Sequence, residues 1–274
     1  MALALTLAAL LHGDLVAGEV RKLAGDMKFT EGPVADAKGH IYFTDIPNGR
    51  IMKWDGKALS VFRENSGGAN GLRIDPEGNL VVCEGGNRRV TRIRPADGRA
   101  AVLADAFGGK KLNSPNDLAL DSRGGVYFTD PRYGKRDDLE QDREAVYYIP
   151  PGGGPLVRVA GDLVRPNGIE YADGILYVAD AGAGKVYRYA VNPDGTLRDR
   201  REFAAVACDG LKTDEKGNVY TTTRNGVEIF APDGKPLGTI RVPEQPSNLC
   251  FGGRTLYITA RTSLYAVPMS VRGR

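Results

Sequence analysis

One short pattern occurs six times along this chain of 274 residues. Each copy begins with a polar residue, usually followed by glycine and an apolar strand, then a tight turn and a second β-rich strand. The clearest copy runs from Arg165 to Asp180. The polar residues that open the copies are Glu31, Asn70, Asn116, Asn167, Asp209 and Asn248. Repeats of about 40 to 50 residues built from short strands are typical of a β-propeller with one blade per repeat.

The repeats fill the chain from Phe29 to about Pro268 without a gap, which favours one domain over two. No stretch shows a sustained helical period, and the 36 glycines suit many tight turns. The sequence therefore predicts an all-β, six-bladed propeller over residues 20–274. To leave no exposed sheet edge, an N-terminal strand near Val20–Leu23 should complete the last blade.

The side chains of the six residues that open the copies, called openers below, should lie close together. In a propeller the first strand of each blade lines the central channel, so the residues that open these strands face a common axis. Glu31 and Asp209 supply carboxylates and the other four supply amides, and such a ring of oxygens suits a hard divalent cation. Backbone capping at blade starts explains Asn70 and Asn248 equally well. It explains Glu31 poorly, because glutamate is not a turn residue.

The charge balance argues against a nucleic-acid partner. The chain has 37 basic and 34 acidic residues, a net charge of +3, and its basic residues form no extended cluster.

The first 19 residues form an Ala- and Leu-rich segment that resembles the apolar part of a signal peptide, although no Lys or Arg precedes Arg21. Cleavage of this segment implies export, for example to the periplasm. The alternative is a retained N-terminal apolar segment, a short helix on the propeller, in a cytoplasmic protein. The segment is short for a membrane span, and no other span is expected.

A charged insertion at residues 132–144 separates two strands of the third repeat. Long charged loops on a repeat scaffold often carry function, so we expect this loop to form a wall or lid at the channel mouth.

Several segments together resemble one known family. They are Phe29–Pro33, Ser114–Asp117, Val126–Gly134, Arg165–Gly168 and Cys208–Leu211. In order and spacing they are similar to the signature segments of the SMP-30/gluconolactonase/LRE family. The resemblance covers nearly the whole chain beyond about residue 25.

The resemblance implies a metal-dependent hydrolase that opens lactones. By match of motif, Glu31, Asn167 and Asp209 are the expected metal ligands, and Asp209 is the expected catalytic base or nucleophile. Asn116 would complete the metal shell or bind the substrate. The cation is expected to be Ca²⁺, with Zn²⁺, Mg²⁺ and Mn²⁺ as alternatives. The expected partner is a small-molecule lactone.

The resemblance leaves the substrate open. Ser114 stands where sugar-lactonase members have an arginine that contacts the sugar, so Arg132, Tyr133 and Arg165 are the candidate substrate contacts. Asp117 follows Asn116 and should point away from it, into a turn or a hydrogen bond between blades. One alternative function is a phosphotriesterase of the fluorophosphatase type on the same site. Another is a non-catalytic, ligand-binding propeller with a structural metal.

Overall fold

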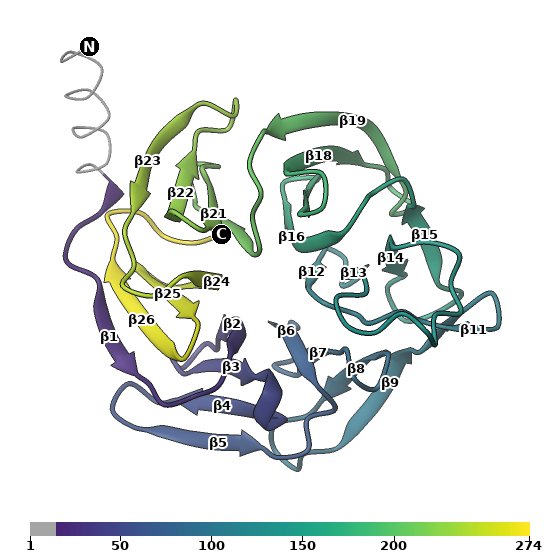
Figure 1. The fold of residues 1–274 in the computed structure, drawn as a ribbon, viewed down its shortest axis with the longest axis horizontal. Coiled ribbons are helices and arrows are strands. Elements are labelled where there is room, and N and C mark those ends of the chain that lie inside the picture. The colour runs from purple at the N-terminus through teal and green to yellow at the C-terminus, as the bar shows by residue number, and fades with distance from the viewer. Residues whose placement is uncertain (1–14) are drawn as a thin grey trace.

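The computed structural model describes residues 15–274. Six four-stranded antiparallel sheets are arranged around a central axis like blades (Figure 1). The fold is therefore the predicted six-bladed, all-β propeller. Most of the segment predicted as a signal peptide or apolar helix lies outside the described residues.

In each blade the strands run in sequence order from the channel outwards, and only the last blade departs from this rule. The inner strands are β2 (Thr30–Ala35), β6 (Ala69–Ile74), β12 (Leu118–Leu120), β16 (Pro166–Ala172), β20 (Leu211–Thr213) and β24 (Pro246–Gly252). The second strands are β3 (Ile41–Asp45), β7 (Leu80–Glu84), β13 (Val126–Asp130), β17 (Ile175–Asp180), β21 (Val219–Thr223) and β25 (Thr255–Ala260).

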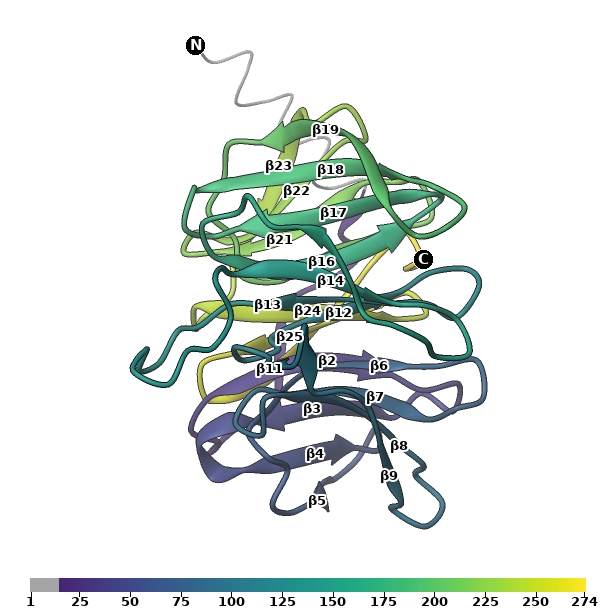
Figure 2. The same cartoon turned by 90° about the vertical axis from the view of Figure 1, so that its right-hand side faces the viewer.

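The third and fourth strands complete the blades. The third strands are β4 (Arg50–Trp54), β8 (Arg89–Ile93), β14 (Ala145–Ile149), β18 (Lys185–Val191), β22 (Gly226–Phe230) and β26 (Ser263–Pro268). The outer strands are β5 (Leu59–Arg63), β9 (Ala100–Ala104), β15 (Val157–Ala160), β19 (Leu197–Ala204), β23 (Pro236–Ile240) and β1 (Arg21–Ala24). Figure 2 shows one blade from its edge, with β16 to β19 following one another in order.

The last blade is closed by the start of the chain. β1 pairs antiparallel with β26, with Arg21 opposite Ala266, and so supplies the fourth strand of the sheet that contains β24 and β25. This confirms the predicted N-terminal closing strand. The pairing covers the edge of β26 and ties the two ends of the propeller together.

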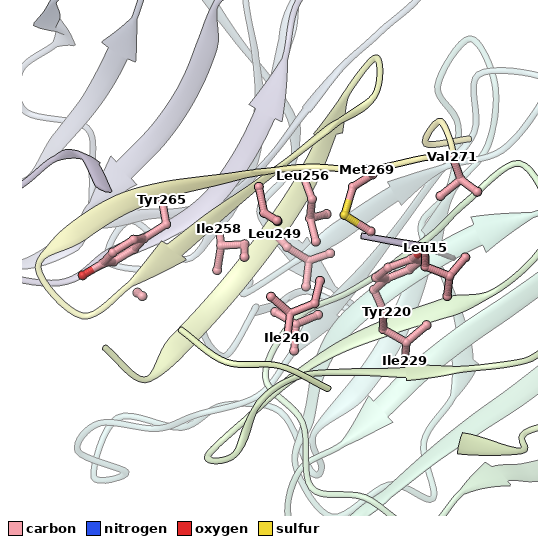
Figure 3. Packing of buried hydrophobic residues seen from close by; sticks show 13 residues of the cluster. Leu15, Tyr220, Ile229, Ile240, Leu249, Leu256, Ile258, Tyr265, Met269 and Val271 are labelled. Carbon is pink, nitrogen blue, oxygen red and sulfur yellow. The ribbon is translucent and has the colours of Figure 1, made fainter. Parts of the chain in front are cut away.

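The hydrophobic core is divided among the blade interfaces. Each second strand is buried on both faces, because it is packed between the neighbouring blades; β3 and β13 are fully buried along their length. The largest cluster lies between the fifth and sixth blades and includes Tyr220, Leu256 and Met269 (Figure 3). Leu15 is 6% exposed and packs into this cluster, so the described end of the N-terminal segment lies against the propeller.

Two further short strands, β10 (Ala106–Phe107) and β11 (Lys110–Lys111), form a hairpin before the third blade. A short 3₁₀ turn, Ile46–Asn48, follows β3. No helix in residues 15–274 is long and apolar enough to cross a membrane.

Candidate active site

A repeated aspartate fixes the backbone that leads into the channel. Asp130, at the end of β13, accepts hydrogen bonds from the backbone N–H groups of Asn113 and Ser114, both at 2.7 Å. Asp45 and Asp180 hold the corresponding amides of the first and fourth blades. The strand-ending aspartate of the repeat therefore sets the path of the two or three residues before an opener.

A threonine just before this aspartate links one blade to the next opener. The Thr129 hydroxyl donates to the backbone carbonyl of Asn167 at 2.7 Å, and Thr44 donates to that of Asn70 at 3.1 Å. These bonds fix the openers relative to one another, and so the geometry of the site is determined by the repeat.

The glycine after an opener allows the inner strands to approach closely. Gly168 donates its N–H to the Asp209 carbonyl at 2.8 Å, and a Cβ at Gly168 would lie 2.4 Å from that oxygen. Gly32 has φ of +46°, and a Cβ there would lie 2.1 Å from the Asn70 carbonyl oxygen. Larger residues would push the blades apart and widen the ring of openers.

These constraints bring most of the predicted site residues to one cavity of about 450 Å³ at the channel mouth. The polar side chains that line it are Glu31, Asn70, Ser114, Asn116, Tyr133, Asn167 and Asp209. All the expected metal ligands thus face a shared space, together with the expected substrate contacts Asn116 and Tyr133.

Arg132 is placed differently from Tyr133. It is not among the residues that line the cavity. Its guanidinium pairs with Asp138 at 3.1 Å, and 13% of its side chain is exposed. Its role in substrate binding stays a prediction.

The insertion at 132–144 forms one wall of the mouth through Tyr133. Arg88 from the second blade pairs with Asp138, and Gln141 donates to the backbone carbonyls of Phe107 and Lys111. The loop is thereby tied to the β10–β11 hairpin and to a neighbouring blade.

Tyr133 also orients one of the expected ligands. The Asn167 amide nitrogen donates to the Tyr133 hydroxyl at 2.7 Å. Because this bond occupies the nitrogen side of the amide, the Asn167 carbonyl oxygen is left available to a cation.

Glu31 is held from the opposite side of the ring. Its Oε2 accepts hydrogen bonds from the Gly32 N–H at 2.6 Å and from the Asn248 amide at 3.0 Å. The same Asn248 nitrogen lies 3.4 Å from Asp117 Oδ2, so Asp117 makes a hydrogen bond between blades, as expected. Asn248 also caps the next backbone N–H through its Oδ1, so its capping and site roles coexist.

A buried charge cluster fills the channel below the openers. Arg73 lies 3.0 Å from Glu170 and 3.8 Å from Asp117, and Lys212 lies 3.7 Å from Glu170. Arg73, Glu170 and Lys212 each stand three residues after an opener. The sequence analysis did not predict this cluster. Its signal in the sequence is the presence of charged residues in strands that the repeat predicts to line the channel.

The two carboxylates of the cavity destabilise each other's charged forms. Burial, with the nearby charge of Asp209, raises the pKa of Glu31 well above its usual range. Burial raises the pKa of Asp209 to about 7; a hydrogen bond from Asn167 opposes this rise and the charge of Asp117 adds to it.

This donor set fits a divalent cation. Among the channel residues, the four carboxyl groups of Glu31, Asp117, Glu170 and Asp209 share only two cationic side chains, Arg73 and Lys212. Glu31 and Asp209 have no cationic partner there. Asn70 Oδ1 is also buried without a hydrogen-bond partner, and capping does not explain it. No group of three or more His, Cys, Asp or Glu side chains in residues 15–274 is placed to hold a metal. A cation in this cavity would therefore need amide oxygens beside the carboxylates of Glu31 and Asp209.

The chain is similar to several known proteins. The family model described as "SMP-30/Gluconolactonase/LRE-like region" matches residues 29–262. A gluconolactonase of Zymomonas mobilis is 33% identical, over 92% of this chain and 82% of that protein. The lactonase drp35 of Staphylococcus aureus is 25% identical, over 78% of this chain and 69% of that protein. The solved structure of a gluconolactonase from Xanthomonas campestris superposes with a TM-score of 0.90 at 34% identity, covering 96% of this chain and 93% of that one.

Proposed function

This chain belongs to the SMP-30/gluconolactonase/LRE-like family, and on that premise we propose that it opens lactones with one divalent cation held in the channel. It is a gluconolactonase-like hydrolase of carboxylic esters. The observation that carries the metal-dependent form of the proposal is the pair of buried carboxylates, Glu31 and Asp209, facing one cavity with Asn167.

Glu31, Asn167 and Asp209 hold the cation in this proposal, and Ca²⁺ suits their oxygens best. The bound cation supplies Lewis acidity toward a lactone carbonyl. Tyr133 and Asn248 orient Asn167 and Glu31 through the hydrogen bonds described above. The ligand set is thereby organised before the substrate arrives.

Asp209 acts as the base. Its carboxylate accepts a proton from the attacking water while the water oxygen bonds to the carbonyl carbon. The ring C–O bond then breaks, the leaving alkoxide takes the proton from Asp209, and a hydroxy acid results. Asn116 lines the same cavity and contacts the lactone through its amide. An acid form of Asp209 cannot accept the proton, so the reaction depends on its deprotonation.

The test is proton release from D-glucono-1,5-lactone, followed with calcium and with excess chelator. We expect activity that chelator removes and calcium restores. Asp209→Asn should lower kcat by about a thousandfold or more, because the base is lost. Asp233→Asn, a substitution in an exposed turn of the same blade, serves as the matched control and should be fully active. Full activity in chelator, or in Asp209→Asn, would exclude the mechanism.

A further inference from the structure

A second cavity opens beside the site, on the side of the fifth and sixth blades. Its volume is about 190 Å³, and it shares Tyr133, Asn167 and Asp209 with the main cavity. The polar side chains that complete its lining are Thr222, Thr223, Arg224 and Gln245. A molecule with its reacting carbonyl at Asp209 can therefore extend a substituent into this side cavity.

Arg224 is placed there by the strand that supports Asp209. The Asp209 N–H donates to the carbonyl of Thr222, near the end of β21, at 2.9 Å. Arg224 follows two residues later, in the turn between β21 and β22. The turn is thus on the mouth face of the propeller, next to the proposed base.

Arg224 is the cationic side chain among the residues that line this cavity, and it is exposed to solvent. The hydroxyls of Thr222 and Thr223 donate to backbone carbonyls of Ser247 and Gly226. Arg224 has no hydrogen bond or ion pair with any described residue. A guanidinium without a partner beside a ligand cavity suits a carboxylate or phosphate group, which it can bind through two parallel hydrogen bonds.

The connections around the side cavity, called the rim below, also carry positively charged side chains. Four arginines lie on connections of the fourth to sixth blades at the channel mouth, the end where the inner strands begin: Arg165, Arg224, Arg241 and Arg261. None of them forms an ion pair with a carboxylate of the described residues. On the opposite side of the mouth, by contrast, Arg88 and Arg132 both pair with Asp138. The arginines without a carboxylate partner are therefore gathered on the side of the mouth where the side cavity lies.

The partners of these rim arginines are neutral. Arg241 donates to the backbone carbonyl of Asn225 at 3.0 Å, and Arg261 donates to the Gln245 side chain at 2.9 Å. The carboxylate of Glu244 lies on the same connection as Gln245. It already accepts hydrogen bonds from Ser263, Tyr265 and Thr262 of the closing blade. It does not neutralise Arg224.

We propose that the side cavity is a subsite for an anionic substituent, a carboxylate or a phosphate, on the lactone that this protein opens. The inference rests on the proposed lactonase function for the reaction and adds the class of substrate. Arg224 binds the anionic group, and the rim arginines increase the rate at which anionic substrates arrive.

The experiment compares lactones that differ in one group. D-Glucono-1,5-lactone is paired with its 6-phosphate, and D-glucono-1,4-lactone with D-glucaro-1,4-lactone, which carries a carboxylate at C6. In the calcium-loaded protein, kcat/KM for the anionic member of at least one pair should exceed that of the neutral member about tenfold. This ratio should fall with added salt. The two pairs distinguish a phosphate from a carboxylate subsite.

Arg224→Gln should reduce the anionic-to-neutral ratio of kcat/KM about tenfold, since a charged hydrogen bond is lost. Arg99→Gln is the matched control. It removes the same charge from the β8–β9 turn, at the end of the blade away from the mouth, and should leave the ratio unchanged. A ratio near one in the unaltered protein, or an equal ratio in Arg224→Gln, would overturn the proposal.

A binding measurement separates this inference from the proposed function. Calorimetry compares the open-chain acids 6-phosphogluconate, glucarate and gluconate on the unaltered protein and on Arg224→Gln. The subsite is supported if 6-phosphogluconate or glucarate binds more tightly than gluconate and Arg224→Gln abolishes this difference in affinity. That holds even if no lactone is opened. Equal binding of all three acids, or binding that Arg224→Gln does not change, would overturn the subsite even if lactones are opened.

Discussion

At the scale of single residues, the site depends on amides and carboxylates that are held from outside the cavity. Glu31 is fixed by Gly32 and Asn248, and Asn167 by Tyr133. None of these partners needs to touch a substrate to matter. Hydrogen-bonding groups of this kind orient the oxygen atoms of a metal-binding side chain, and this orientation affects the affinity of the site for a cation.

Tyr133→Phe tests this positioning directly. The substitution removes the hydroxyl that accepts the Asn167 amide hydrogen at 2.7 Å but keeps the ring at the cavity wall. We expect the calcium dissociation constant, measured by calorimetry, to rise about tenfold, because the Asn167 amide is then free to rotate. Tyr187→Phe, in the outer part of the fourth blade, is the control and should bind calcium unchanged. Equal affinities of the two variants would contradict the positioning role.

At the scale of elements, the closing blade is held by more than strand pairing. Glu244, on the connection from β23 to β24, receives hydrogen bonds from Ser263 and Tyr265 of β26 and lies 3.6 Å from Lys22 of β1. It therefore links the last repeat to the first strand of the chain.

The stability provided by Glu244 should depend on pH. Burial acts to raise the pKa of Glu244, but the hydrogen bonds from Ser263, the Thr262 N–H and Tyr265 outweigh it and lower this pKa to about 2. Because the pKa in the folded state lies below the ordinary value of 4.5, the stabilisation is complete above about pH 5 and disappears as pH falls toward 2.

Denaturant unfolding of Glu244→Gln and of the unaltered protein, at pH 6.5 and at pH 3, measures this contribution. We expect the variant to be less stable at pH 6.5 and the difference to shrink at pH 3. A difference that stays constant, or grows as pH falls, would show that the carboxylate charge is not responsible.

At the scale of the whole molecule, much of the architecture is readable from the sequence, because a repeat constrains every copy at once. The six openers predicted the blade number, and the exposed edge of β26 predicted its partner β1. Five of the six openers line one cavity, and the sixth, Asn248, donates a hydrogen bond to Glu31.

The sequence does not show contacts across the channel. Arg73 and Glu170 are 97 residues apart, and their 3.0 Å contact depends on how the ring closes. The same is true of Asn248 and Glu31, which are 217 residues apart. Arg132 and Tyr133 show the limit within a loop, since adjacent residues face different surroundings once the loop is anchored. The repeat in the sequence predicts which residues face the channel axis. Which of these residues contact one another depends on distances that only the three-dimensional structure gives.

Ring closure leads to a prediction about the whole molecule. Deleting residues 1–24 removes β1 and leaves the edge of β26 unpaired. We expect a lower melting temperature and self-association, seen by thermal unfolding and light scattering. A synthetic peptide of residues 15–28, added in excess, should reverse the self-association and restore part of the stability. A deletion variant that does not self-associate more than the unaltered protein and melts at the same temperature would show that closure by β1 is dispensable.

The central claim is that Glu31, Asn167 and Asp209 converge on one cation, and calorimetric titration of the chelator-treated protein with Ca²⁺ tests it most directly. The account predicts one ion per chain in the unaltered protein. In Glu31→Gln, which keeps the size of the side chain but removes one buried carboxylate charge, it predicts binding weaker by about a hundredfold or more. Absence of binding in the unaltered protein, or the same affinity in Glu31→Gln, would contradict it.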